Sequence, residues 1–197
     1  MARAPAMAAE SRRTQLLRAA SRSFAAKGYH GTGVADIVAE AGVARGTFYR
    51  HFESKREAFT AVLQDMMREV VSVVQPIDIG APIAEQVWAN LDRLVRAIMV
   101  EEVARVLFSE AVGIDAEGDE ALREFYGAAL SRIETALLAG QTLGIVHDGD
   151  VKLKARALLG VIKEPVVQAK LYGESVDAEA LVGELILLLR LGVLKND

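Results

Sequence analysis

Apolar side chains recur every three or four residues along almost the whole chain, and no stretch shows the every-second-residue pattern of a β-strand. This spacing matches the 3.6 residues per turn of an α-helix. Near the start, Leu16, Leu17, Ala20 and Phe24 follow it, and Gly28 comes where such a helix would end. The sequence therefore predicts an all-α fold, and it contains no repeat of fixed length.

We expect about nine helices in total. Three short helices and one long helix occupy the first third of the chain, and the long one carries apolar residues along one side: Phe59, Val62, Leu63, Met66, Val70 and Val73. Five more helices are predicted near 83–99, 101–114, 119–142, 151–171 and 177–193. Pro165 falls inside the fourth of these five and should kink or interrupt it, because proline has no backbone N–H.

Composition limits the classes of protein to which the chain can belong. With 197 residues and 52% hydrophobic content, it can bury a substantial core in one or two domains. It has no cysteine, which excludes disulfides and thiolate metal sites and fits a reducing compartment such as the cytoplasm. The most apolar run, 181–194, is broken by Glu184 and Arg190 and is too short to span a bilayer. Residues 1–9 lack the apolar segment of a secretory signal, so a disordered arm is predicted there.

Charge is distributed unevenly along the chain. Residues 1–56 contain ten basic and four acidic side chains, a net charge of +6, whereas residues 57–197 contain 13 basic and 23 acidic ones, a net charge of −10. A basic head on an acidic body suggests a module that binds polyanions, joined to a part that does not. The alternative is that the basic residues cluster by chance on a solvated face.

Residues 42–55, GVARGTFYRHFESK, combine three aromatic side chains with two arginines, a histidine and a lysine. A short apolar helix near residues 34–38 precedes this stretch, and Gly42 separates the two, which is the layout of a helix-turn-helix. At about 100° per residue on a helix, Phe48 and Phe52 lie close together and should point inward.

The opposite side of that helix carries groups suited to contact DNA. Three residues face outward and three flank them: Gly46, Thr47 and Arg50, with Arg45, Tyr49 and His51 beside them. Gly46 has no side chain, so the backbone can approach DNA closely. Arg50 can offer a bidentate contact to guanine, and Thr47 can offer a hydroxyl or a methyl group. Tyr49 and His51 can donate hydrogen bonds to phosphates.

A second phosphate site is predicted at the end of this stretch. Ser54 to Glu57 has the S-x-x-E form of a capping box, so the fourth helix should begin at Ser54. Its N-terminal amides could hold a phosphate, with charge added by Lys55 and Arg56. The alternative is that Ser54 only caps the helix and the basic side chains are solvated.

A dense set of residues in the head follows the pattern of a known family. It comprises Gly28, Tyr29, Thr32, Val34, Asp36, Ile37, Ala41, Gly42, Val43, Gly46, Thr47, Phe48, Tyr49, His51, Phe52, Ser54 and Lys55. This pattern resembles the N-terminal domain of the TetR (tetracycline repressor-like) transcriptional regulators over about residues 10–70.

The resemblance implies a dimeric, all-helical repressor with an N-terminal DNA-binding head and a C-terminal domain that binds an effector and dimerises. With the disordered arm at 1–9, we expect the head at 10–56 and the effector-binding and dimerisation domain at 57–197. It also implies DNA contacts by Thr32, Arg45, Thr47, Tyr49, His51 and Lys55. Gly33 and Ala44 stand where the family commonly has serine or threonine, so backbone amides would replace two hydroxyl contacts there.

The acidic body is expected to bind a small-molecule effector of unknown identity, with no cofactor and no metal. The candidate effector-binding residues are Met66, Trp88, Phe108, Glu110 and Phe125. Large aromatic side chains at helical spacing can equally be core. Glu110 shares a side with apolar neighbours, and an inward carboxylate needs a partner, which could be Arg105 or a ligand.

The last two helices are more apolar than one buried stripe requires. Their candidate dimer-interface residues are Ala157, Val161, Leu181, Leu185, Leu188 and Leu189. Two such helices from each subunit could form a four-helix interface with two-fold symmetry. The alternative is that both are core helices of a single chain.

No catalytic residues are predicted. The three histidines are scattered, and no glycine-rich phosphate loop or G-x-S-x-G turn is present. His147 to Asp150 could in principle hold a cation, but a polar loop between helices is favoured. We therefore predict a sequence-specific DNA-binding transcriptional regulator, a repressor released from its operator by a small molecule. The alternatives are an architectural DNA-binding protein without a ligand and an enzyme with a DNA-binding head.

Overall fold

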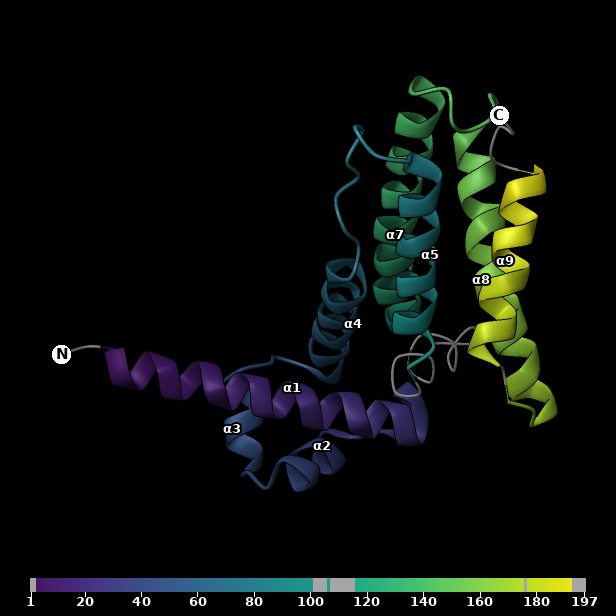
Figure 1. The fold of residues 1–197 in the computed structure, drawn as a ribbon. Coiled ribbons are helices and arrows are strands. Elements are labelled where there is room, and N and C mark those ends of the chain that lie inside the picture. Colours follow the sequence, from purple (N-terminus) through teal and green to yellow (C-terminus); the bar gives the residue numbers. More distant parts are fainter. Residues whose placement is uncertain (1–2, 101–105, 107–115, 176, 193–197) are drawn as a thin grey trace. The chain divides into compact units, whose positions relative to one another are not determined.

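The computed structural model describes residues 3–100, 106, 116–175 and 177–192, and within these it contains eight α-helices and no β-strand (Figure 1). The helices are α1 (Arg3–Gly31), α2 (Val34–Ala41), α3 (Arg45–Tyr49), α4 (Lys55–Ser72), α5 (Ile83–Ile98), α7 (Ala116–Thr142), α8 (Val151–Tyr172) and α9 (Ala178–Gly192). The predicted all-α fold is confirmed, and the expected number of about nine helices is close. The helix expected at 101–114 lies outside the described residues, apart from Val106.

Gly28 divides α1 into two helical stretches. Its φ of 71° and ψ of 173° are not helical, and a positive φ of this size is strained for residues with a side chain. The predicted helix stop at Gly28 is therefore seen as a sharp break, after which the chain makes one more turn and ends at Gly31.

The beginning of α1 differs from the disordered arm that the sequence predicts for residues 1–9. The helix already begins at Arg3. Four alanines within residues 4–9 explain this difference, because alanine has the most favourable helix propensity of all residues. Pro5 is tolerated because it stands in the first turn, where a backbone N–H has no helical partner.

The chain divides into two compact units: residues 1–67 with 101–123, and residues 68–100 with 124–197. In the first unit, α1, α2 and α3 pack around large buried side chains: Leu16, Phe24, Ile37, Phe48, Phe52, Phe59 and Leu63. Phe24, Tyr29 and Phe59 form one aromatic cluster, with ring centroids 4.8 to 5.9 Å apart. This core fixes how α2 and α3 sit on α1.

The second unit contains α5, α8, α9 and the larger part of α7 (Figure 1), and Leu137 of α7 packs with Ala155 of α8 in one buried cluster. α9 contacts both α5 and α8, and Val95 of α5 and Leu185 of α9 are almost completely buried. The loop before α5 is fastened to it by Asn90, whose side chain makes two 2.8 Å hydrogen bonds with the backbone of Gln75. α8 continues through Pro165, so of the kink or interruption that the sequence predicts there, an interruption does not occur.

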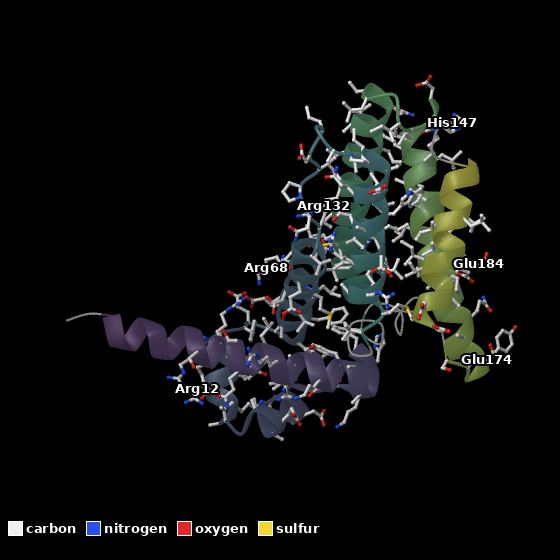
Figure 2. The ribbon with its side chains drawn as sticks, in the orientation of Figure 1. Arg12, Arg68, Arg132, His147, Glu174 and Glu184 are labelled. Atoms are coloured by element: carbon white, nitrogen blue, oxygen red, sulfur yellow. The ribbon has the colours of Figure 1, made fainter. Side chains whose placement is uncertain are left out.

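The loop between α7 and α8 carries His147, which is labelled in Figure 2. The ammonium of Lys154 donates to the carbonyl oxygens of His147 and Asp148. The carboxylate of Asp150 accepts the backbone N–H of Lys152 at 2.8 Å and so caps α8. These contacts give His147 to Asp150 the role of a polar helix–helix loop, the reading that the sequence favoured. Among the described residues, no group of histidine, aspartate and glutamate side chains has the arrangement of a metal site.

Candidate nucleic-acid interface

The turn between α2 and α3 is built on Gly42. This residue has a left-handed backbone (φ 65°), and its N–H donates to the carbonyl of Ala39 at 3.1 Å. The N–H of Val43 then donates to the carbonyl of Val38 at 3.0 Å. This pair of bonds closes the end of α2 and turns the chain directly into α3, as expected for a helix-turn-helix.

The two faces of α3 have opposite character. Phe48 is fully buried, and Phe52, just beyond the helix, is 1% exposed, with its ring centroid 5.5 Å from that of Phe48. The inward position predicted for both aromatic side chains is therefore confirmed. The other face lies at the surface, with Arg45, Gly46, Tyr49 and Arg50 exposed and Thr47 and His51 partly exposed.

Polar contacts order the exposed face of α3. The guanidinium of Arg50 donates to the hydroxyl of Thr47 at 3.1 Å. The guanidinium of Arg45 lies 5.8 Å from the centroid of the Tyr49 ring and donates to the Tyr49 hydroxyl at 3.4 Å. The exposed face of α3 thus presents two neighbouring groups that can donate hydrogen bonds, the guanidinium groups of Arg45 and Arg50. Contact of these six residues with DNA remains a prediction.

No contact within the described chain explains why residue 46 is a glycine. A Cβ atom placed on it would meet no other atom within 4 Å, so packing does not require glycine at this position. Glycine inside a helix is unfavourable by roughly 0.5–1 kcal/mol relative to alanine. A surface that approaches the α3 backbone from outside would account for it.

The start of α4 confirms the cap predicted at Ser54. The Ser54 hydroxyl accepts the N–H of Glu57 at 3.1 Å, and the Glu57 carboxylate accepts the N–H of Glu53 at 2.5 Å. Arg56, expected to add charge toward a phosphate, forms a 2.7 Å ion pair with Glu120 at the start of α7. Both residues belong to the first unit and both are solvent-exposed.

Thr32 and Gly33, both predicted to contact DNA, have their polar groups engaged within the head in this structure. The Thr32 side chain is buried, and its hydroxyl lies 3.0 Å from the carbonyl oxygen of Ser23 and 2.7 Å from that of Gly28. The N–H of Gly33 donates to the carboxylate of Asp36 at 2.7 Å. The reason is local: the Thr32 hydroxyl is turned back onto the carbonyls of α1, and Asp36 caps the start of α2.

Lys55 is also engaged within the head. Its ammonium lies 4.1 Å from the centroid of the Tyr29 ring and donates a 2.8 Å hydrogen bond to the Tyr29 carbonyl. In this structure it therefore joins α4 to the end of α1, in place of the free phosphate donor that the sequence predicted.

Two basic residues near the start of α1 were missed by the sequence analysis. Arg12, labelled in Figure 2, is exposed, and the guanidinium of Arg13 lies 5.1 Å from the centroid of the Phe52 ring, close to the end of α3. The adjacent arginine pair is the signal that could have found them. Gln15 on the same helix donates to the carbonyl of Ala41 at 2.7 Å and so ties α1 to the end of α2.

The predicted effector-binding residues are distributed over both units. Met66 is buried in the first unit, whereas Trp88 and Phe125 are half-buried in the second. Phe108 and Glu110 lie outside the described residues. Next to Phe125 on α7 lies Tyr126, whose ring centroid is 5.4 Å from that of Phe125.

Two of the residues predicted to form the dimer interface are buried in the core of a single chain. Leu181 is 9% exposed and Leu185 is 2% exposed within a single chain, because this side of α9 packs inside the second unit. Their assignment to an interface is therefore corrected. Leu188 is 53% exposed, Ala157 is exposed and Val161 is half-buried, whereas the Leu189 side chain lies outside the described residues. Leu153 and Leu187, which the sequence analysis did not select, are also exposed.

Among the helices of the described residues, none is long and apolar enough to cross a membrane.

Comparison with known proteins points to one group. Residues 16–62 match the family model for bacterial regulatory proteins of the tetR family. The HTH-type transcriptional activator FasR of Mycolicibacterium smegmatis is 46% identical over 66 residues, which cover 34% of this chain and 30% of FasR.

Two solved structures share the fold over most of the chain. The transcriptional regulator FadR from Bacillus subtilis, solved in complex with stearoyl-CoA, matches with a TM-score of 0.76 and 24% identity, covering 89% of this chain and 96% of FadR. A regulator from Saccharomonospora viridis, solved in complex with choline, matches with a TM-score of 0.70 and 20% identity, covering 95% of this chain and 100% of the regulator. At these identities the likeness shows the fold alone.

Proposed function

Since this chain belongs to the TetR family of bacterial transcriptional regulators, we propose that it binds an operator sequence in double-stranded DNA and represses transcription until a small molecule releases it. The observation that carries this proposal is the α3 surface. There Arg45, Thr47, Tyr49 and Arg50 are gathered around Gly46, while Phe48 anchors the helix from behind.

The proposed contacts divide into two kinds. Arg50 and Thr47 are linked to each other and stand at the centre of the exposed face, where base edges would lie when α3 enters the major groove. Arg45, Tyr49 and His51 stand beside them and would contact phosphates. Because Lys55 and Arg56 already have partners in the head, their contribution to phosphate binding would require those contacts to open.

The protein is proposed to act as a homodimer through α8 and α9. Leu153 is 64% exposed, and Leu187 and Leu188 are 50% and 53% exposed, although all three are large and apolar. A second copy that covers these side chains would bring two α3 helices to two half-sites of one operator.

The effector is proposed to bind in the second unit, among the aromatic side chains on α5 and α7. Trp88 and Phe125 are half-buried there, as expected for residues that line a site and still meet a ligand. FadR with stearoyl-CoA and the regulator with choline show that proteins of this fold accept small molecules. No turnover of the ligand is proposed.

The experiment is a binding titration with DNA from upstream of the gene itself, followed by transcription in vitro. We expect preference for one DNA sequence over a scrambled control and lower transcription when the protein is added. A dimer that neutralises six or more phosphates should also lose about 10³-fold in affinity between about 50 and 200 mM salt. Binding without sequence preference would support the architectural alternative, and increased transcription would identify an activator.

A second step screens small molecules for release of that DNA. We expect at least one compound to lower DNA affinity and, by thermodynamic reciprocity, to bind less tightly when DNA is saturating. A compound that the protein converts chemically would instead support the enzyme alternative.

A further inference from the structure

Lys163 on α8 is a half-buried cation that lies against an aromatic ring. Its ammonium nitrogen is 5.0 Å from the centroid of the Tyr126 ring on α7. Within the described part of the chain, no aspartate or glutamate oxygen lies within 4.0 Å of it. This is unexpected, because the second unit lies in the strongly acidic part of the sequence.

A partly buried ammonium loses hydration, and a carboxylate usually compensates for that loss. The face of a tyrosine ring attracts a cation, but it carries no net charge and compensates only in part. Lys163 therefore retains the capacity to bind an anion that is not part of the described chain.

The groups known to lie near Lys163 carry no negative charge. A tyrosine phenol is uncharged at neutral pH, and burial raises the pKa of Tyr126 further, to about 12, so it adds no negative charge beside the lysine. The ring of Phe125 meets that of Tyr126 edge to face. Two residues after Lys163, Pro165 has no N–H, so the carbonyl of Val161 cannot form its usual helical hydrogen bond.

We propose that Lys163, backed by the Tyr126 ring, binds the anionic headgroup of an amphipathic effector, a carboxylate or a phosphate joined to an apolar chain. The inference rests on the proposed function, since it gives the chemical class of the effector. The apolar part of the ligand would lie against aromatic side chains such as Phe125.

The same geometry disfavours a cationic effector. Aromatic ring faces bind quaternary ammonium groups, but here the Tyr126 ring already faces the ammonium of Lys163. A ligand such as choline would meet a like charge at this position. The site therefore favours a ligand whose headgroup is negatively charged.

The test uses Trp88, the single tryptophan of the chain, as a fluorescent reporter in the second unit. Five probes are titrated into the wild type below their critical micelle concentrations: laurate, lauroyl-CoA, CoA alone, neutral monolaurin and cationic dodecyltrimethylammonium. We expect laurate or lauroyl-CoA to bind at least about 10-fold more tightly than monolaurin, the gain expected for a charge-assisted hydrogen bond, and the cationic probe to bind worst.

Laurate and lauroyl-CoA distinguish a carboxylate site from a phosphate site. Binding of CoA alone shows whether the headgroup suffices without the apolar chain. Because these comparisons use the wild type, they do not depend on the folding of any variant. Equal binding of the anionic, neutral and cationic probes, or no binding of any anionic probe, would overturn the proposal.

Variants then test the residue itself. Lys163→Met keeps the apolar stem and should remove the preference for the anionic probe, about 10-fold, without changing monolaurin binding. Lys163→Arg, which keeps the positive charge, should retain the preference for the anionic probe. Lys152→Met, which changes an exposed lysine on the same helix, is the matched control and should bind like the wild type. Unchanged anion binding by Lys163→Met would overturn the proposal.

The operator titration separates this inference from the proposed function. If anion binding depends on Lys163 but no bound probe releases DNA, the anion site stands and the proposed release mechanism fails. If a neutral or cationic compound releases DNA equally from the wild type and from Lys163→Met, the proposed function stands and this inference is overturned.

Discussion

The ammonium of Lys55, at the first residue of α4, lies 4.1 Å from the centroid of the Tyr29 ring and donates a hydrogen bond to the Tyr29 carbonyl at the end of α1. This contact makes Lys55 part of the framework of the head. The sequence predicts a phosphate donor at this position, and the two roles lead to different results on substitution.

Lys55→Met should lower the stability of the protein by about 1 kcal/mol, because it removes one hydrogen bond and one cation–π contact. Thermal unfolding followed by circular dichroism measures the change, and Arg18→Met, an exposed substitution on α1, serves as the control. An unchanged unfolding midpoint together with weaker binding to every DNA sequence would return Lys55 to the role of a phosphate donor.

Gly46→Ala should separate stability from DNA binding. Because the added methyl group meets open space, it should stabilise α3 by roughly 0.5–1 kcal/mol. The same methyl group should weaken operator binding if the α3 backbone approaches DNA. Gly42→Ala is the contrasting variant, since the left-handed backbone at Gly42 should make it destabilising. Operator binding by Gly46→Ala as tight as that of the wild type would refute a close approach.

Asp36 should contribute to stability at neutral pH and lose that contribution in acid. The pKa of its carboxyl group is lowered, first by the hydrogen bond from Lys27 and then by the N–H of Gly33. A group whose pKa is lower in the folded state stabilises above its unfolded pKa of about 3.9, and this stabilisation disappears as the pH falls through the folded value.

Asp36→Asn should therefore have a lower free energy of unfolding than the wild type near pH 7. This difference in free energy should become smaller as the pH falls below about 4. Denaturant titrations of both proteins at several pH values measure this difference. Glu40→Gln is the control, because Glu40 pairs with Arg22 at an exposed site where ion pairs contribute little. A gap that is constant down to about pH 3 would contradict a role for the Asp36 charge.

The helical framework and the inward side of α3 could be predicted from the sequence, because each depends on spacing alone. Phe48 and Phe52 are four residues apart, which puts them on one side of any helix. The partners of Thr32 could not be predicted, since they depend on how the chain turns back on α1 at the backbone break at Gly28. The roles on α9 could not be predicted either: its apolar residues surround the helix, so periodicity does not separate Leu185, which is core, from Leu188, which is exposed.

The exposed leucines of α9 give a test of the proposed dimer. Leu187 and Leu188 are about half exposed in one chain, so replacing both with glutamate should leave the subunit folded but place like charges in the interface. Sedimentation should then show a monomer, with operator binding strongly weakened. Leu185→Ala instead removes core volume and should lower stability by about 2–5 kcal/mol. A dimer that survives the double glutamate change would exclude this face.

The most direct test of the account is selection of DNA from a random double-stranded library, performed in parallel with the wild type and Arg50→Ala. We expect the wild type to enrich an inverted repeat whose half-sites are separated by about one helical turn, 34–36 Å, or a multiple of it. Arg50→Ala should enrich the same repeat with preference relaxed at one base pair of each half-site, a change of roughly 1–3 kcal/mol. No enrichment by the wild type, or an enriched sequence that Arg50→Ala selects with undiminished preference at every position, would contradict recognition of an operator through the exposed face of α3.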